Sequence, residues 1–195
     1  MIQGIELVDW RNKDEVIKFY EANKHYLDNY QSIVDLDSQL GVIDLKISYC
    51  NALIGKRHYS ECLETLTHLN IMINKLKNDP LVDYSSRYEK YLFTEGIVFG
   101  YLKRYEESQD NFKELVEIDP KNDLYKDWFE SNKIKIIAKQ SNIVGYTGFG
   151  IIVLNLFLDL IFKIKLGNYV DLIGLSAMIF GFSFPYIKGL IIKIK

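Results

Sequence analysis

The chain has 195 residues, of which 26% are charged and 48% are hydrophobic, and its formal net charge at pH 7 is −2. Its first 141 residues carry a net charge of −5, which argues against a nucleic-acid-binding protein, because such a protein needs a basic face to displace counterions from phosphates. The spacing of the two cysteines, Cys50 and Cys62, signals neither a disulfide framework nor a metal site.

The N-terminal segment, residues 1–37, is predicted to hold one amphipathic helix. Its first six residues lack both a basic and an apolar region, so they do not resemble a secretory signal peptide, and we expect this end of the chain to stay where it is made. Asn12 and Glu15 have the spacing of a capping box, and apolar residues recur at helical spacing after them. We therefore expect a helix over 13–36 that packs on the rest of the soluble domain.

Further helical patterns follow up to residue 140, and they predict an all-α fold. Pro80 and Pro120 stand where helices are expected to begin. No alternating pattern of apolar and polar residues is long enough for a sheet. The predicted helices cover residues 38–55, 59–77, 81–102, 105–118 and 122–140.

One window carries a more specific signature of bulky, small and aromatic residues at fixed spacing. The residues that form it are Leu92, Glu95, Gly96, Phe99, Tyr105, Ser108, Phe112, Leu115 and Pro120. This window resembles the tetratricopeptide repeat (TPR) family, in which each repeat is a pair of antiparallel helices. In that pattern Gly96 and Ser108 occupy the positions where the paired helices touch most closely. Leu92 and Glu95 depart from it, since the pattern prefers Trp and Leu there.

A second copy of the signature lies 46 residues upstream. Its residues are Cys50, Leu53, Tyr59, Cys62, Leu66 and Leu69. The resemblance implies that Cys50 and Cys62 fill the two small-residue positions of one helical hairpin, where cysteine acts as a small hydrophobe. A redox pair is the alternative. We therefore expect TPR-like antiparallel helical hairpins over residues 38–140, with the helix at 122–140 capping the stack.

The TPR resemblance also implies a binding surface. In that family the first helix of each pair lines a concave groove that holds an extended peptide or a partner helix. The residues that the corresponding helices would present here are Ile47, Asn51, Lys90, Phe93, Thr94, Ile97, Tyr101 and Trp128. A few aromatic anchors among polar groups suit a peptide groove. Two alternatives stay open, a groove that is open to a partner and one that the N-terminal helix covers.

The last part of the chain, residues 141–195, is predicted to be a transmembrane helical hairpin. Nineteen consecutive residues from Gln140 to Leu158 carry no charge, and about 20 apolar residues in a helix cross a bilayer core of about 30 Å. We expect spans at about 142–162 and 168–188, joined by a short loop with Lys163 and Lys165. A buried hairpin in a soluble core is the alternative, but no other part of the chain is apolar enough to surround two such helices.

Both predicted spans carry small or polar residues at spacings of three and four, which places them on one stripe of each helix. The stripes consist of Gly145, Gly148, Ile152, Asn155 and Asp159 in the first span and Gly174, Ala177 and Gly181 in the second. Because small residues let helix backbones approach closely in lipid, we expect the stripes to face each other, with Asn155 buried between the helices or in an oligomer. We expect Asp159 to pair with Lys163, with a proton or ion path through Asp159 as the alternative. Asn168 and Asp171 have the spacing of a cap for the second helix.

The lysines predict the orientation of the hairpin. Three lysines precede the first span and three follow the second, against two in the loop between them. The positive-inside rule then places the soluble domain and the C-terminus in the cytoplasm. A bacterial inner membrane is the favoured location for this integral membrane protein.

The sequence carries no constellation that is typical of an enzyme. The three histidines, His25, His58 and His68, share no ligand spacing, and no phosphate loop, nucleophile elbow or zinc motif occurs. We therefore expect no enzymatic activity, no cofactor and no metal. The leading hypothesis is a membrane-anchored adaptor that recruits a protein partner to the bilayer. One alternative is a membrane effector, such as a pore-forming or immunity-type protein, whose hairpin oligomerises under control of the soluble domain; another is an accessory subunit of a larger membrane complex.

Overall fold

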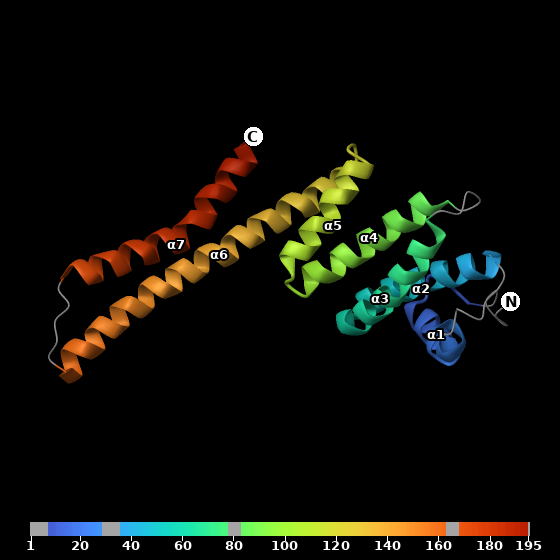
Figure 1. Ribbon diagram of the computed structural model, residues 1–195, viewed down its shortest axis with the longest axis horizontal. Helices are drawn as coiled ribbons and strands as arrows, with labels where there is room; N and C mark the ends of the chain where they lie inside the picture. Colours follow the sequence, from blue (N-terminus) through green and yellow to red (C-terminus); the bar gives the residue numbers. More distant parts are fainter. Residues whose placement is uncertain (1–7, 29–35, 78–82, 163–167, 195) are drawn as a thin grey trace. The chain divides into compact units, whose positions relative to one another are not determined.

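The structure of the chain, a computed structural model, describes residues 8–28, 36–77, 83–162 and 168–194. Every regular element in these ranges is helical and none of them is a strand, so the all-α prediction is confirmed. The chain divides into two compact units, Met1–Phe129 and Glu130–Lys195, which we call the N-terminal unit and the C-terminal unit. Figure 1 shows the helices in chain order.

Seven α-helices and one π-helical turn make up the described part of the chain. They are α1 (Lys13–Asp28), α2 (Leu36–Lys56), α3 (Tyr59–Leu76), α4 (Tyr84–Tyr101), α5 (Tyr105–Ile118), α6 (Asp123–Phe157), the π-helical turn η3 (Leu158–Phe162) and α7 (Asn168–Ile194). The bounds of α5 agree with the prediction, and those of α2 and α3 differ from it by one or two residues. The predicted helix 122–140 and most of the first predicted span form a single helix, α6. Parts of two other predicted helices fall on residues 29–35 and 78–82, which lie outside the described residues.

Asn12 caps the first turn of α1. Its Oδ1 accepts a hydrogen bond from the backbone N–H of Asp14 (3.1 Å), and its Nδ2 donates to Oε1 of Glu15 (3.0 Å). The other carboxylate oxygen of Glu15 accepts from the backbone N–H of Asp9 (3.2 Å). The capping spacing thus identifies the start of the helix, although Glu15 reaches a residue three positions earlier than the usual motif requires.

Helix α1 packs antiparallel on α2. Asp14, in the first turn of α1, pairs with Lys56 at the end of α2 (2.8 Å). Further along, the ring of Tyr20 stacks on that of Tyr49 with the centroids 3.8 Å apart, and the hydroxyl of Tyr49 donates a hydrogen bond to Glu21. These contacts define the N-terminal helix as a layer that covers one side of α2.

An ion pair joins Asp28, the last residue of α1, to Lys46 in the middle of α2. Nζ of Lys46 lies 2.7 Å from Oδ1 of Asp28 and donates a second hydrogen bond to the hydroxyl of Tyr20 (2.8 Å). The side chain of Lys46 is 1% exposed, whereas that of Asp28 is 33% exposed. Burial opposes the ionisation of Asp28, but the hydrogen bond and the charge of Lys46 outweigh it, so the pKa of this carboxyl lies below its usual value.

The core of the N-terminal unit is built from one face of each of its first five helices. Residues at most 1% exposed at its centre include Val16, Ile43, Leu53, Leu66, Leu69, Val98, Phe112 and Leu115. Burying a side chain of this kind contributes about 1.5–3 kcal/mol relative to leaving it exposed. Leu66 and Phe112 are aligned by the 46-residue repeat, and so are Leu69 and Leu115. Each aligned pair is buried in full, one member in each hairpin.

The turns that close the two hairpins, between α2 and α3 and between α4 and α5, have the same backbone geometry. Arg57 and Lys103, 46 residues apart, have positive φ angles of 66° and 62°. The residues after them, His58 and Arg104, each donate the backbone N–H to a carbonyl oxygen five residues earlier, at 2.9 Å in both cases. This is the hydrogen bond of a Schellman motif, in which glycine is the usual residue with positive φ. The two hairpins therefore repeat each other in their turns as well as in their cores.

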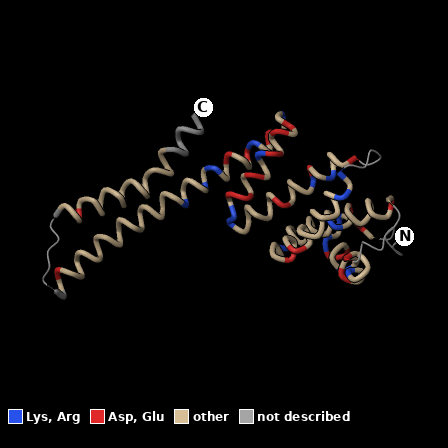
Figure 2. Tube along the Cα trace, viewed as in Figure 1, with Lys and Arg blue, Asp and Glu red and all other residues tan. Residues whose placement is uncertain are grey.

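Within the described residues, two helices are long and apolar enough to cross a membrane. The candidate segments run from Asp123 to Leu160 and from Tyr169 to Ile187. Within their most apolar stretches only 17% and 11% of the residues are buried, unlike the helices of the N-terminal core. Figure 2 shows how few charged residues lie along the described part of α7 and the later part of α6. Length and composition together fit a bilayer core of about 30 Å.

Candidate functional site

The small residues of the repeat pattern lie where the paired helices meet. Oγ of Ser108 donates a hydrogen bond to the carbonyl oxygen of Gly96 (2.6 Å), and a Cβ atom added to Gly96 would lie 2.8 Å from the ring of Phe112. In the first hairpin, Sγ of Cys62 lies 3.6 Å from the carbonyl oxygen of Cys50. Corresponding positions in the two hairpins thus make the same contact from side chain to backbone.

Cys50 and Cys62 are free thiols, and both are buried. Sγ of Cys50 also faces the carbonyl oxygen of Cys62, at 3.8 Å. The interaction with Cys62 and then burial raise the pKa of the Cys50 thiol well above its usual value. Since the thiolate is the reactive form of cysteine, these contacts favour a packing role over a redox role for the pair.

The eight residues predicted to line a binding groove differ in their exposure. Ile47 and Thr94 are buried, Phe93, Ile97 and Trp128 are half-buried, and Asn51, Lys90 and Tyr101 are exposed. The hydroxyl of Thr94 is used within its own helix, where it donates to the carbonyl oxygen of Lys90 (2.7 Å). A partner could therefore contact Asn51, Lys90 and Tyr101 directly, whereas Ile47 and Thr94 support the fold.

Phe93 is covered by helices that follow it in the chain. Its ring meets that of Phe112 edge-on, with centroids 6.0 Å apart, and that of Tyr125 at 5.7 Å. Helix α1 packs on α2, as described above. The side of α4 that carries Phe93 thus faces α5 and the start of α6.

Glu95, which departs from the repeat pattern, ties α4 to α5. Its two carboxylate oxygens accept hydrogen bonds from the hydroxyl of Tyr91 (2.5 Å) and from Nδ2 of Asn111 (2.8 Å). Burial and the hydrogen bond to Glu95 raise the pKa of Tyr91. A similar pair joins α6 to α4, where the hydroxyl of Tyr125 donates to Glu89 (2.6 Å). The carboxylates thus accept hydrogen bonds from tyrosine hydroxyls that would otherwise be buried without a partner.

Three aromatic rings from three helices form a continuous row at the C-terminal end of α4, and we call this row the aromatic edge. Tyr59, the first residue of α3, stacks on Tyr101, the last residue of α4, with centroids 4.8 Å apart. Tyr101 in turn meets Trp128 of α6 at 6.3 Å. Tyr101 is 51% exposed. The sequence placed Tyr101 and Trp128 in a groove and missed Tyr59, because the repeat alignment pairs Tyr59 with Tyr105 and gives no signal for a contact between hairpins.

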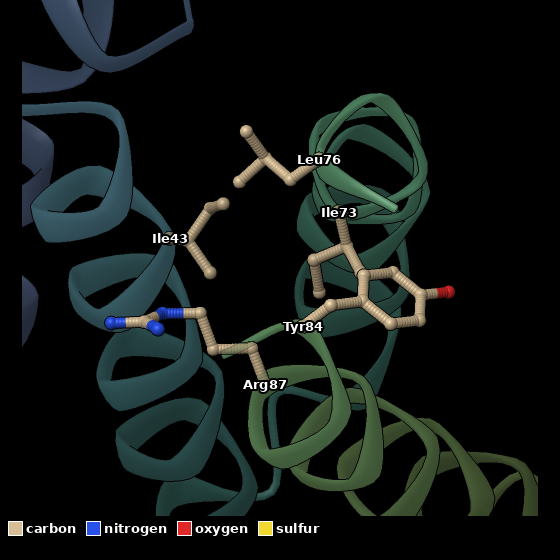
Figure 3. A pocket seen from close by; sticks show the side chains of 5 residues that line it. All are labelled: Ile43, Ile73, Leu76, Tyr84 and Arg87. Atoms are coloured by element: carbon tan, nitrogen blue, oxygen red, sulfur yellow. The ribbon is translucent and has the colours of Figure 1, made fainter. Parts of the chain in front are cut away.

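A narrow gap between α2, α3 and α4 is the site of a cross-helix ion pair and is too small for a ligand. Its lining consists of Ile43, Ile73, Leu76, Tyr84 and Arg87. In Figure 3 the aliphatic side chains point towards one another and the guanidinium of Arg87 extends towards α2. There it lies 2.9 Å from a carboxylate oxygen of Asp44. We therefore interpret this gap as part of the packing between the two hairpins.

In the C-terminal unit the two small-residue stripes face each other. A Cβ atom on Gly148 would lie 2.5 Å from the carbonyl oxygen of Gly174 and 3.0 Å from Cβ of Ala177. A Cβ atom on Gly181 would collide with the backbone of Gly145. At both levels the backbones of α6 and α7 approach too closely for a side chain to fit between them. Small residues are what such close approach requires in lipid.

Asn155 lies between the two helices and connects them. Its Nδ2 donates a hydrogen bond to Oδ1 of Asp171 in α7 (2.7 Å), and the residue is 8% exposed. Asp171, which was predicted to take part in a helix cap, thus makes a contact between helices. Asp159 is exposed and lies in the π-helical turn η3. Its predicted partner, Lys163, lies outside the described residues.

Among the residues that the structure describes, no three His, Cys, Asp or Glu side chains lie close enough to hold a metal ion. Comparisons of the chain with models of protein families, with curated proteins and with solved structures found no match. The functional interpretation therefore rests on the geometry of the two units.

Proposed function

We propose that the chain is a membrane-anchored adaptor, in which the N-terminal unit recruits a protein partner and the two apolar helices hold it at a bilayer. The proposal rests on one observation, the division of the chain into a unit with two equivalent helical hairpins and a unit of two apolar, largely exposed helices. Paired helices that repeat in this way resemble the TPR family, whose members bind peptides or helices of other proteins. A membrane anchor joined to such a unit would hold the bound protein partner at the bilayer.

The exposed surface of α2 and α4 supports the recognition half of the proposal. Within the described residues the side chains of Asn51 and Lys90 form neither a hydrogen bond nor an ion pair, so a partner would not have to displace an internal contact. An asparagine offers both a donor and an acceptor to a peptide backbone, and a lysine offers a charge to a carboxylate. Tyr101 adds an exposed aromatic ring, a residue type that is enriched among binding hot spots.

The exposed apolar faces of α6 and α7 support the membrane half. Large side chains at least 55% exposed in these helices include Ile143, Phe149, Leu154, Leu156, Ile173 and Phe180. In water, an apolar surface of this size would associate with other apolar surfaces, whereas the hydrocarbon core of a bilayer solvates it. We propose an integral membrane location with the N-terminal unit and the C-terminus in the cytoplasm, because more lysines flank the two helices on that side than in the loop.

The test uses the full-length chain, tagged, extracted in a mild detergent and crosslinked before purification. The variant Asn51→Ala, Lys90→Glu, Tyr101→Ala is expected to lose a protein that the wild type captures. A matched variant changes exposed residues of α3 and α5 in the same way: Thr67→Ala, Lys113→Glu and Ile71→Ala. This control variant is expected to retain the partner. If both variants retain the same proteins, the surface of α2 and α4 is not the recruiting surface.

A second candidate function is that of a membrane effector whose hairpin oligomerises. The observation that favours it is Asp159, an exposed acid in the π-helical turn that ends the first apolar helix. Such turns interrupt the regular hydrogen-bond ladder and are frequent at functional sites, and acids at membrane depth are costly. In a dye-leakage assay with reconstituted vesicles, an effector would release dye and Asp159→Leu would abolish the release. Vesicles that stay sealed at high protein density would contradict this function.

A third candidate function is that of an accessory subunit of a larger membrane complex. It also requires the membrane anchor, but its partner would bind at a different surface. Subunits of such a complex would contact α6 and α7, and not α2 and α4. Crosslinking from exposed positions on the hairpin, such as Phe149 and Ile173, would then capture another membrane protein. Capture that depends on Asn51 and Lys90 instead supports the adaptor.

A further inference from the structure

The carbonyl oxygen of Asn155, Oδ1, is buried and has no hydrogen-bond donor among the described residues. It belongs to the amide whose Nδ2 donates to Oδ1 of Asp171 across the hairpin (2.7 Å). The residue as a whole is 8% exposed. A buried acceptor without a donor is costly in free energy, so native proteins rarely keep one. The contact between Asn155 and Asp171 therefore calls for a second hydrogen bond, made to this oxygen.

The pair lies on the seam between α6 and α7, one helical turn beyond a close contact of the two helices. A Cβ atom on Gly174 would lie 2.8 Å from Cγ1 of Ile152. Asn155 follows Ile152 by three residues, and Asp171 precedes Gly174 by three. The neighbouring residues on the outer faces of both helices are apolar and exposed, and they are Leu154, Leu156, Leu172 and Ile173. In a bilayer such faces meet hydrocarbon, which supplies no hydrogen-bond donor.

We propose that Asn155 and Asp171 form a proton-binding site, and that the bound proton closes the hairpin at this level. An ionised carboxylate only accepts hydrogen bonds, so it serves the NH2 group of Asn155 and leaves the carbonyl oxygen without a donor. A protonated carboxyl has an O–H donor as well. With a proton on Oδ2, Asp171 donates to Oδ1 of Asn155 while its own Oδ1 still accepts from Nδ2. The two side chains then share a closed ring of two hydrogen bonds.

Proton uptake at this site needs no further reactant. The proton comes from water and returns to it, and the O–H bond of Asp171 is the one covalent bond that forms or breaks. Asp171 is partly exposed, so its carboxyl can exchange a proton with the surroundings of the hairpin. The other titratable residues along these stretches of the two helices, within the described part of the chain, are Asp159 in η3 and Tyr169 in α7, and both are exposed. Lys163 and Lys165 lie outside the described residues.

Loss of the proton should loosen the hairpin beside Asn155. The pair then keeps one hydrogen bond in place of two and carries a negative charge, which is costly next to hydrocarbon. Further along the seam, a Cβ atom on Gly181 would collide with the backbone of Gly145, so backbone atoms make that contact. The separation of α6 and α7 should therefore depend on pH beside Asn155 and not beside the glycines. The inference rests on the membrane location proposed above, because the cost of the charge depends on the surrounding hydrocarbon.

The test uses the full-length chain in lipid nanodiscs, titrated from about pH 4 to about pH 9, which covers the titration of exposed and buried carboxyls. Infrared spectra of the wild type minus those of Asp171→Asn report whether this carboxyl holds a proton. Spin labels at Leu156 and Leu172, both exposed, report the separation of the helices beside the pair. A second pair of labels, at Phe149 and Ile179, reports it next to the glycine contacts. We expect the first distance to lengthen as the carboxyl loses its proton and the second to stay constant.

Two variants distinguish the pair from its surroundings. Asp171→Asn cannot ionise, and its amide supplies both an acceptor and a donor to Asn155, so it should keep the short distance at every pH. Asp159→Asn is the matched change at the exposed acid four residues after Asn155, and it should keep the response of the wild type to pH. A response in Asp171→Asn equal to that of the wild type, or its loss in Asp159→Asn, would overturn the inference.

A spin label at Leu154, on the exposed face of α6, tests the membrane anchor separately. Greater access of this label to oxygen, which dissolves in lipid, than to a water-soluble nickel complex shows that the hairpin lies in hydrocarbon. With that result, three outcomes overturn the inference and leave the anchor intact: a carboxyl at Asp171 that never takes up a proton, uptake without a change at the first label pair, and an equal change at both label pairs. Greater access to the nickel complex overturns both proposals.

Discussion

Gly96 in α4 lies against the ring of Phe112 in α5, and a Cβ atom at position 96 would come within 2.8 Å of that ring. At the same crossing Ser108 donates its hydroxyl hydrogen to the carbonyl oxygen of Gly96 (2.6 Å). The close packing of the second hairpin therefore depends on the absence of a side chain at position 96. Gly41 in α2 provides the contrast, since no heavy atom lies within 4 Å of its Cβ position.

We expect Gly96→Ala to lower the free energy of unfolding by about 1–2 kcal/mol. Overpacking costs about 1–3 kcal/mol, which exceeds the gain of about 1 kcal/mol from the better helix propensity of alanine. Gly41→Ala makes the same substitution without the clash and should raise stability by up to about 1 kcal/mol. Urea unfolding of the full-length chain in detergent, followed by circular dichroism, measures both. Changes of the same sign in the two variants would contradict the packing described here.

The two hairpin turns provide a second prediction, since each places a residue with a side chain at positive φ. An L-residue in this region costs about 1–2 kcal/mol, which glycine avoids at the expense of about 0.5–1 kcal/mol of chain entropy. Arg57→Gly and Lys103→Gly should therefore each stabilise the protein by about 0.5–1 kcal/mol. Lys113→Gly, at an exposed position inside α5, is the control and should destabilise it by about 1 kcal/mol. Thermal unfolding of the three variants checks the sign of each effect.

The pair of Lys46 and Asp28 leads to an asymmetric prediction. Asp28→Ala leaves a buried ammonium with the hydroxyl of Tyr20 as its remaining described partner, and we expect a loss of about 2–3 kcal/mol. Lys46→Met leaves a carboxylate that is one-third exposed and open to water, so the loss should stay within about 1 kcal/mol. Denaturant titrations measure the loss in the free energy of unfolding of each variant relative to the wild type. A larger loss for Lys46→Met than for Asp28→Ala would show that the lysine contributes mainly by its charge.

The same pair predicts a dependence on pH. The folded protein lowers the pKa of Asp28 below its usual 3.8, so ionised Asp28 stabilises the fold above that pH, and the contribution disappears as the pH falls through the lowered folded value. The measurement compares the wild type with Asp28→Asn, which keeps the shape and cannot ionise. We expect the wild type to be the more stable of the two at pH 6 and the difference to shrink below about pH 4. A difference that stays constant down to pH 2 would contradict the ionic role of Asp28.

Local signals in the sequence predicted most of the helical framework, because they depend on residues close together in the chain. The cap at Asn12, Pro120 and the spacing from Tyr105 to Leu115 all act within a few turns, and the bounds of α5 follow from them. The choice of neighbour for each helix face depends on residues far apart. The pattern placed Phe93 in a groove, and it gave no signal for the contacts of this ring with Phe112 and Tyr125.

Polar residues at apolar positions were the hardest to interpret from sequence. Lys46 lies among apolar residues of α2, and Glu95 occupies a position where the repeat prefers leucine. The sequence pattern alone explains neither of these charged residues. The structure gives both a partner on another helix, Asp28 for the lysine and Asn111 for the glutamate. In the C-terminal unit the same holds for Asn155, whose partner Asp171 lies across the hairpin. A polar residue at an apolar position thus indicates a contact with another helix but does not identify the partner residue.

The close approach of α6 and α7 yields the last prediction. Gly148 and Gly150 are two residues apart in α6, but a Cβ atom on Gly148 would lie 2.5 Å from the carbonyl oxygen of Gly174, whereas nothing lies within 4 Å of the Cβ position of Gly150. Gly148→Leu should therefore push the two helices apart, towards the axial distance of about 8–10 Å that larger side chains require. Gly150→Leu should leave the hairpin as it is, because its side chain would meet no atom of α7.

Pulsed electron spin resonance on the full-length chain in lipid nanodiscs measures this difference. Spin labels at Ile143 in α6 and Ile187 in α7, both exposed, report the separation of the helices. We expect Gly148→Leu to shift and broaden the distance distribution, and Gly150→Leu to reproduce that of the wild type. An unchanged distribution in Gly148→Leu would mean that the hairpin is not held by contact between its glycines. Because both variants add the same apolar side chain to the same helix, a general effect of volume or hydrophobicity would change both equally, and only the contact with Gly174 separates them.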